Sequence, residues 1–150
     1  MGYWDEIPER PNGGTAIADW WNIFRTKLIG YFGAGGIGET SFTLPNNQSS
    51  ATDVTGLSFS ISSVRSAIVT YEVSRKTDTA LSELRSIGRL FLAYRAQSSA
   101  WEILNQQENG DDSGVTFTVT AGGQVQVATT NIAGSNYVGT LKFKGESFNV

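Results

Sequence analysis

Apolar and polar residues alternate along most of the chain after Glu39. Val115, Phe117 and Val119 alternate with threonines, and similar runs recur at short intervals. A period of two is typical of a β-strand with one face buried and the other in water. The pattern predicts about eight strands, near residues 41–44, 57–61, 66–74, 86–95, 99–105, 115–120, 124–130 and 137–144.

Turn-forming residues separate these runs. The two runs on either side of Gly122-Gly123 are expected to pair as a hairpin. The number and spacing of the strands predict a mainly β fold, an antiparallel β-sandwich or jelly roll. Residues 79–86 fit either a helix or a strand with a bulge. The other turn signals are Pro45-Asn46-Asn47, Asn109-Gly110-Asp111-Asp112 and Gly134-Ser135-Asn136.

The first part of the chain has a different pattern. Residues 1–14 predict an extended arm that ends in prolines and glycines. Apolar side chains then recur every three or four residues, which predicts an amphipathic helix over residues 16–31. Glycines in 33–38 end it as a hinge, so we expect an anchoring part, 1–38, and a β-sandwich domain, 39–150. The apolar stripe of the helix consists of Ile17, Trp20, Trp21, Phe24, Leu28 and Phe32.

The chain contains neither cysteine nor histidine. Thiolate zinc sites, cysteine nucleophiles and Ser-His-Asp triads are therefore excluded within one chain. Its 14 acidic residues fall in no catalytic motif, so we expect no enzyme, no cofactor and no metal site. Glu108, Asp111 and Asp112 are interpreted as a solvated turn. The glycines at 33–38 match a dinucleotide-binding spacing, but a helix precedes them and a strand follows, which is the reverse of that site.

The charge pattern narrows the choice of partners. The formal net charge is −3, which argues against a broad nucleic-acid surface. The densest basic stretch consists of Arg65, Arg75, Lys76, Arg85, Arg89 and Arg95, and is interpreted as solvated strand edges. No apolar run approaches the ~20 residues that span a bilayer, so no membrane insertion is expected. The acidic residues within 1–14 argue against a signal peptide, so synthesis in a cytoplasm is expected.

The aromatic stripe and arm carry more apolar surface than a short helix can bury alone. This surface either packs on the β domain or docks onto a partner or further copies of the chain, and the glycine hinge favours docking. The candidate residues for docking and self-assembly are Tyr3, Trp4, Ile17, Trp20, Trp21, Phe24 and Leu28.

Several segments resemble proteins of tailed-bacteriophage virions. Residues 42–51, 54–57, 71–77, 109–127 and 136–144 are similar to domains common in tail and fibre-like proteins, and residues 18–28 to segments near the start of tail fibres. The resemblance implies a virion structural protein, a short fibre, tail or appendage component, anchored through its N-terminal helix. It also implies a homotrimer, partners among the capsid, neck or tail proteins, and synthesis in the host bacterial cytoplasm.

Two alternatives stay open beside this hypothesis. One is a capsid decoration or head-fibre protein. The other is an adhesion module that binds host glycan through aromatic side chains of the β domain. Tyr94, Trp101 and Tyr137 are the candidate glycan contacts, and at least one of them is expected in the core instead.

Overall fold

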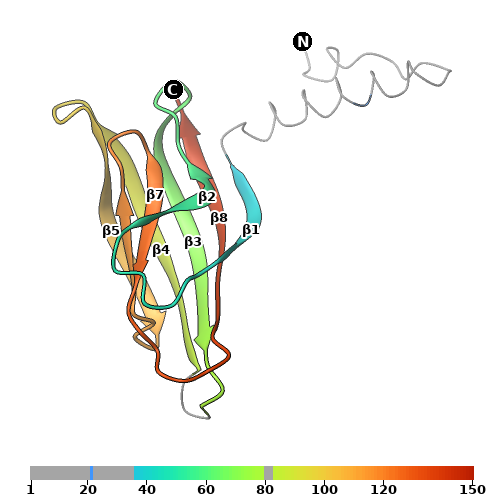
Figure 1. Cartoon of the computed structure of the whole chain (residues 1–150). Coiled ribbons are helices and arrows are strands. Elements are labelled where there is room, and N and C mark those ends of the chain that lie inside the picture. Colours follow the sequence, from blue (N-terminus) through green and yellow to red (C-terminus); the bar gives the residue numbers. More distant parts are fainter. Residues whose placement is uncertain (1–20, 22–35, 80–82) are drawn as a thin grey trace. The chain divides into compact units, whose positions relative to one another are not determined.

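The computed structural model describes Trp21, residues 36–79 and residues 83–150 (Figure 1). The chain divides into two units, Met1–Ala34 and Gly35–Val150, and the second is the β domain. The predicted arm, the helix over 16–31 and the hinge up to residue 35 lie outside the described residues, apart from Trp21, whose backbone is helical.

Eight β-strands form the β domain, which confirms the predicted fold class (Figure 1). Each strand is antiparallel to the strands it pairs with. The strands are β1 (Ile37–Thr43), β2 (Thr52–Ser58), β3 (Val64–Lys76), β4 (Leu84–Arg95), β5 (Ala100–Gly110), β6 (Val115–Val119), β7 (Gln124–Thr129) and β8 (Val138–Asn149).

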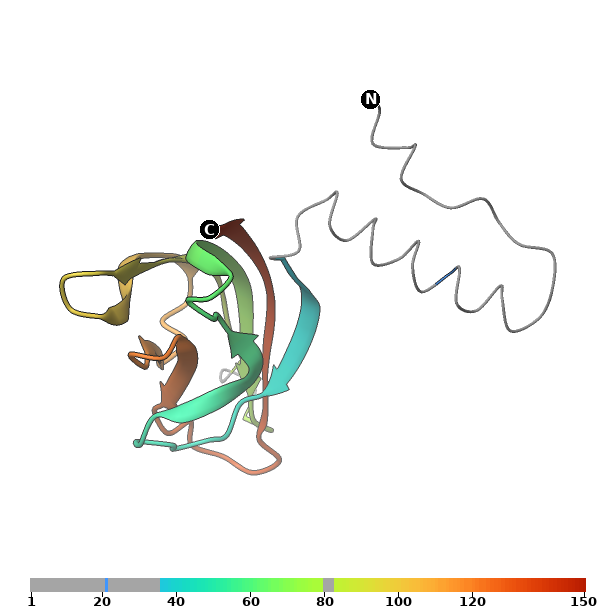
Figure 2. The same cartoon turned by 90° about the horizontal axis from the view of Figure 1, so that it is seen from above.

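The strands form two sheets that face each other as a β-sandwich, as the view from above shows (Figure 2). The larger sheet has the order β1-β8-β3-β4-β5, and the smaller has the order β2-β7-β6. The central strand β3 pairs with β8 on one side and with β4 on the other. The last strand in the sequence, β8, therefore lies between β1 and β3.

The alternation in the sequence places the core between the two sheets. On β3, Ala67, Val69, Tyr71 and Val73 are buried, and the residues between them point to the opposite face. Burial of a side chain such as Val or Leu stabilises by roughly 1.5–3 kcal/mol, which holds the sheets together. Other core residues are Leu44, Val54, Leu57, Phe59, Val64, Leu90, Leu92, Trp101, Val115, Phe117, Val125, Val127, Leu141 and Phe143.

The predicted hairpin is confirmed as β6 and β7. In its turn, Thr120 N donates to Gln124 O at 2.9 Å and Gly123 N donates to Thr120 O at 2.9 Å. Gly123 has a φ of 93°, and a side chain there would contact the Phe59 carbonyl and the Trp101 ring. Both constraints require glycine at this position.

Several strand boundaries differ from their predictions, and β8 continues to Asn149, beyond the predicted end at residue 144. The strand expected at 57–61 is β2, which begins earlier and ends at Ser58. Gly56 has a φ of 85° and the register with β7 shifts between Asp53 and Ser58, so this strand is irregular. β5 continues to Gly110, through residues predicted as a loop. The prediction failed there because the second half of β5 exposes both faces and therefore shows no alternation.

The structure also decides part of two further segments, the predicted glycine hinge and the undecided segment 79–86. Ile37 and Gly38, assigned to the hinge, belong to β1, and Ile37 pairs with Gly145 of β8. In the undecided segment 79–86, residues 84–86 are part of β4 and residues 80–82 lie outside the described residues.

The edge strands of the β domain are short or irregular. The register of β1 with β8 and of β2 with β7 shifts along the strand. The register of β5 shifts between Phe91 and Leu92 of its partner β4. The remaining edge strand, β6, has five residues. Such irregularities hinder the pairing of an exposed edge with another sheet.

Candidate functional site

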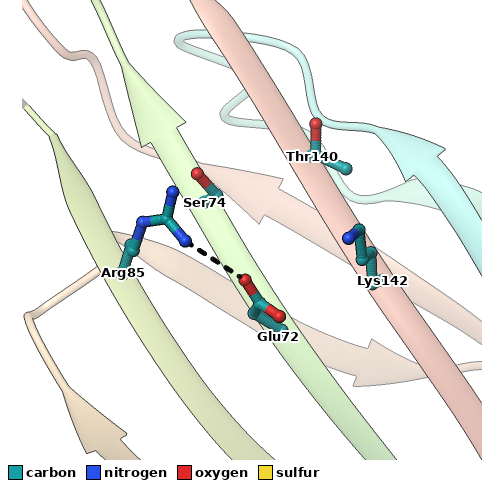
Figure 3. Close-up of a pocket in the computed structure, with 5 residues that line it drawn as sticks. All are labelled: Glu72, Ser74, Arg85, Thr140 and Lys142. Carbon is teal, nitrogen blue, oxygen red and sulfur yellow. Dashed lines mark ion pairs between the residues drawn. The ribbon is translucent and has the colours of Figure 1, made fainter.

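The face of the larger sheet that points away from the core carries three adjoining hollows. In the first, Glu72 on β3 lies between Arg85 of β4 and Lys142 of β8 (Figure 3). Arg85 Nη1 is 3.6 Å from Glu72 Oε1, and Arg85 Nε donates to Glu83 Oε1 at 2.8 Å. This hollow has a volume of about 180 Å³ and is lined by Glu72, Ser74, Arg85, Thr140 and Lys142.

The other two hollows continue the first across the sheet. The second shares Glu72 and Lys142 with the first and has a volume of about 350 Å³. The third shares Thr70 and Ile87 with the second and has a volume of about 280 Å³. We name the three hollows together the outer trough. Its lining also includes Glu39, Lys144, Arg89, Gln107 and Asn109.

The charges of the outer trough are unevenly paired. Arg85 is paired with carboxylates, whereas Arg89, Lys142 and Lys144 form no ion pair with any described residue. The chain as a whole has a net charge of −3, so this face is locally more basic than the rest of the protein. The trough thus offers cations, hydroxyl groups and amides to a ligand.

The structure separates the three aromatic candidates for glycan contact. Trp101 is 3% exposed and packs against Phe59, with ring centroids 5.7 Å apart. Trp101 is therefore a core residue, as expected for at least one of the three candidates, and burial removes its ring faces from any ligand. Tyr94 is half-buried, with its ring edge-on to Trp101 and the Arg65 guanidinium 5.6 Å from its centroid.

Tyr137 lies at the other end of the sandwich and is half-buried. Its hydroxyl accepts a hydrogen bond from Arg75 Nε at 3.0 Å and donates one to Pro45 O at 3.2 Å. The Arg75 guanidinium also lies 5.6 Å from the centroid of the Tyr137 ring. Tyr94 and Tyr137 are therefore not brought together, and both are engaged by arginines.

A buried arginine joins several loops near Tyr137. Arg75, at the end of β3, is 0% exposed, which contradicts its interpretation as a solvated strand-edge residue. The alternation carried the signal, because Val73 is a core residue and Arg75 is two positions further on. Its hydrogen bonds are Nη1 to Ser113 O (2.6 Å) and Gly114 O (3.4 Å), Nη2 to Thr130 O (2.5 Å) and Asn46 Oδ1 (3.2 Å), and Nε to Tyr137 OH (3.0 Å).

A second polar cluster surrounds the hydroxyl of Tyr71. Gln106 Nε2 donates to Tyr71 OH at 3.2 Å and to Glu108 Oε2 at 3.2 Å, and Ser113 Oγ donates to Glu108 Oε1 at 3.0 Å. Burial, assisted by the nearby Glu108 carboxylate, raises the pKa of Tyr71 to about 12. The phenol is therefore neutral at physiological pH.

The acidic residues after β5 bind the protein's own groups. Asp111 Oδ2 accepts a hydrogen bond from Arg85 N at 2.9 Å, and Asp112 Oδ1 accepts one from Gly114 N at 3.0 Å. Side chains of this kind hold turns by accepting from backbone amides. Within residues 36–79 and 83–150, the acidic side chains form no group of three that could hold a metal ion.

The predicted docking residues fall almost wholly outside the described part of the chain. Trp21 is described and is 56% exposed. Helices long and apolar enough to cross a membrane are absent from the described ranges. The docking candidates outside the described residues are Tyr3, Trp4, Ile17, Trp20, Phe24 and Leu28.

Comparison with known proteins gives one similarity in fold. No model of a known family matches the chain, and no curated protein matches it. The structure is similar to part of the tailspike protein of Acinetobacter phage vB_ApiP_P1, with a TM-score of 0.42 and 16% sequence identity. The match covers 74% of this chain and 21% of that chain, so it spans about a fifth of the tailspike.

Proposed function

We propose that this protein is a structural component of a tailed-bacteriophage virion, a short fibre or other tail appendage. Its N-terminal part attaches it to the particle and its β domain faces outward. It acts by binding and not by catalysis. The proposal starts from the resemblance of residues 18–28 and 109–127 to phage fibre-like proteins, and the β domain supplies the physical argument.

One observation carries the division of roles. Every described core residue of the β domain lies between Leu44 and Phe143. The two sheets bury these residues against each other, so the described β-strands form a core of their own. The aromatic residues of the predicted helix, Trp20, Trp21 and Phe24, are assigned to the attachment because buried aromatic residues of this kind commonly form the centre of an interface.

We further propose that the protein assembles as a homotrimer through its N-terminal part. The edge strands of the β domain are short or irregular, which disfavours assembly by strand pairing. An interface made by the aromatic stripe needs no such edge. Sedimentation of the full chain should give three times the monomer mass of 16.2 kDa, whereas a monomer at all accessible concentrations would contradict a trimer.

The attachment is tested on assembled particles of the phage. The variant Trp20→Ala with Trp21→Ala is expected to fold its β domain but to be absent from purified particles, as measured by quantitative mass spectrometry. The matched control is Ile87→Ala with Phe148→Ala, which removes two apolar side chains that are 56% and 59% exposed on the β domain. This control should be incorporated at the normal level.

Each outcome of the particle experiment has a defined meaning. If the native chain is absent from particles, the proposal of a virion protein is wrong. If the tryptophan variant is incorporated normally and the control is lost, the β domain is the anchor and the assignment of roles is reversed. If labelling of the protein on intact particles locates it on the capsid instead of the tail, it is a decoration or head-fibre protein.

A further inference from the structure

The outer trough has cationic side chains that form no ion pair within the described part of the chain. Arg89, Lys142 and Lys144 form no ion pair with any described residue, although the chain has more acidic than basic residues. A single small anion would gain little from exposed cations, because water and salt screen each of them. A polymer with repeated acidic groups can engage several of them at once.

The strand geometry spaces these cations for such a polymer. Lys142 and Lys144 lie on the same face of β8, two positions apart, which corresponds to about 7 Å. Lys144 is opposite Thr70 on β3, and Thr70 is opposite Arg89 on β4. Arg89 is therefore two strand spacings from Lys144, or about 10 Å. The cations are spread over an open surface and are not gathered around one point.

The rest of the lining suits a sugar chain. Thr70, Ser74 and Thr140 supply hydroxyl groups, and Gln107 and Asn109 supply amides, so the surface both donates to and accepts from ring hydroxyls. Ile87 is 56% exposed at the junction of the second and third hollows and offers an apolar contact to the C–H face of a ring.

The position of Glu72 argues against a nucleic acid. This carboxylate lies in the middle of the trough, 3.6 Å from Arg85, and Glu39 lines the second hollow. A nucleic-acid strand carries one charge per ~3.4 Å, so some of its phosphates would face these carboxylates. A polymer with sparser acidic groups can place neutral hydroxyls beside Glu72 and its acids beside the lysines.

We propose that the outer trough binds an acidic polysaccharide, whose carboxylates contact Lys142, Lys144 and Arg89 and whose hydroxyls contact the polar residues between them. This inference goes beyond the structural role proposed above and does not depend on it. It places the carbohydrate on the broad face of the larger sheet, away from the aromatic residues Tyr94, Trp101 and Tyr137.

The test measures binding of the purified full chain to oligogalacturonate by isothermal titration calorimetry at low salt. The variant Lys142→Gln with Lys144→Gln is expected to weaken binding about tenfold or more, because two charge contacts are lost. The matched control, Arg65→Gln with Arg95→Gln, removes the same charge at the far ends of β3 and β4 and should stay within about twofold. Added salt should weaken binding of the native chain.

Four results would overturn the proposal. The first is no heat of binding with oligogalacturonate, and the second is equal binding of an uncharged maltodextrin. The third is an equal loss of binding in both double variants. The fourth is tighter binding of a single-stranded oligonucleotide, which would make the trough a nucleic-acid site. The lysine variant should be incorporated normally into particles, so this experiment and the attachment experiment fail independently.

Discussion

Replacement of Arg75 by methionine is expected to destabilise the β domain through its loops. The guanidinium is fully buried, and its described hydrogen bonds go to neutral acceptors on four segments of the chain. Methionine fills much of the same volume but donates nothing. The change therefore isolates the hydrogen bonds from the packing of the side chain.

The expected loss of stability follows from the hydrogen-bond acceptors that remain after Arg75 is replaced. Thr130 O still accepts from Asn47 N at 3.2 Å, and Gly114 O still accepts from Thr130 N at 2.9 Å. Among the described hydrogen bonds, Ser113 O has no donor besides Arg75, so it becomes an unsatisfied buried carbonyl. Such a group costs ~1–3 kcal/mol, and the lost bonds from a charged donor raise the expected loss in unfolding free energy to about 3–4 kcal/mol.

Urea denaturation of the full chain measures the loss, and hydrogen exchange locates it. Amides near residues 46–48, 113–114 and 130 should exchange faster in Arg75→Met. Arg75→Lys keeps the charge but not the planar set of five donors, so it should still lose at least about 2 kcal/mol. Native stability in either variant, with unchanged exchange in these loops, would show that Arg75 does not hold the loops together.

Three further predictions concern the β domain. The pKa of Tyr71 is raised from 10 to about 12, so its neutral phenol contributes fully to the stability of the fold below pH 10. About 3 kcal/mol of this stability is lost as the pH rises through 12, and Tyr71→Phe should remove this pH dependence in alkaline denaturation curves. Gly123→Ala, forced to a positive φ and against the Phe59 carbonyl, should cost about 3 kcal/mol in urea, whereas Gly122→Ala should change stability by less than about 0.5 kcal/mol. Residues 36–150 alone should give a β-type circular dichroism spectrum and a cooperative thermal transition, and a disordered product would contradict the independence of the β domain.

The alternation of residues predicted the strands because burial on one face imposes a period of two. It identified the core of β3 and the β6–β7 hairpin, whose turn needs glycine. It missed residues 106–110 of β5, because both faces of that part of the edge strand are exposed and no alternation is imposed. It displaced β2 because Leu57 and Phe59 are both core residues, although Phe59 lies just beyond the strand.

The sites were harder to predict than the strands, because they depend on pairing between distant segments. The outer trough combines residues of β1, β3, β4, β5 and β8, and no local motif links them. Residue type suggested that Arg75 was solvated, whereas its position in the alternation implied burial, and position prevailed because the loops supply acceptors for its donors. Whether the Trp101 side chain is buried or exposed was ambiguous for the same reason, because the strand that lies opposite it in the fold decides this.

The strand order also sets the sequence of events during synthesis. β8 lies between β1 and β3, so the larger sheet cannot close until residues 138–149 have left the ribosome. Until then one edge of β3, thirteen residues long, has no neighbour and can pair with other chains. Contacts between segments as distant as Ile37 and Gly145 are typical of slow folding. Nascent chains made close together on one messenger RNA can therefore pair wrongly with each other. The finished domain resists such pairing because its edge strands are irregular.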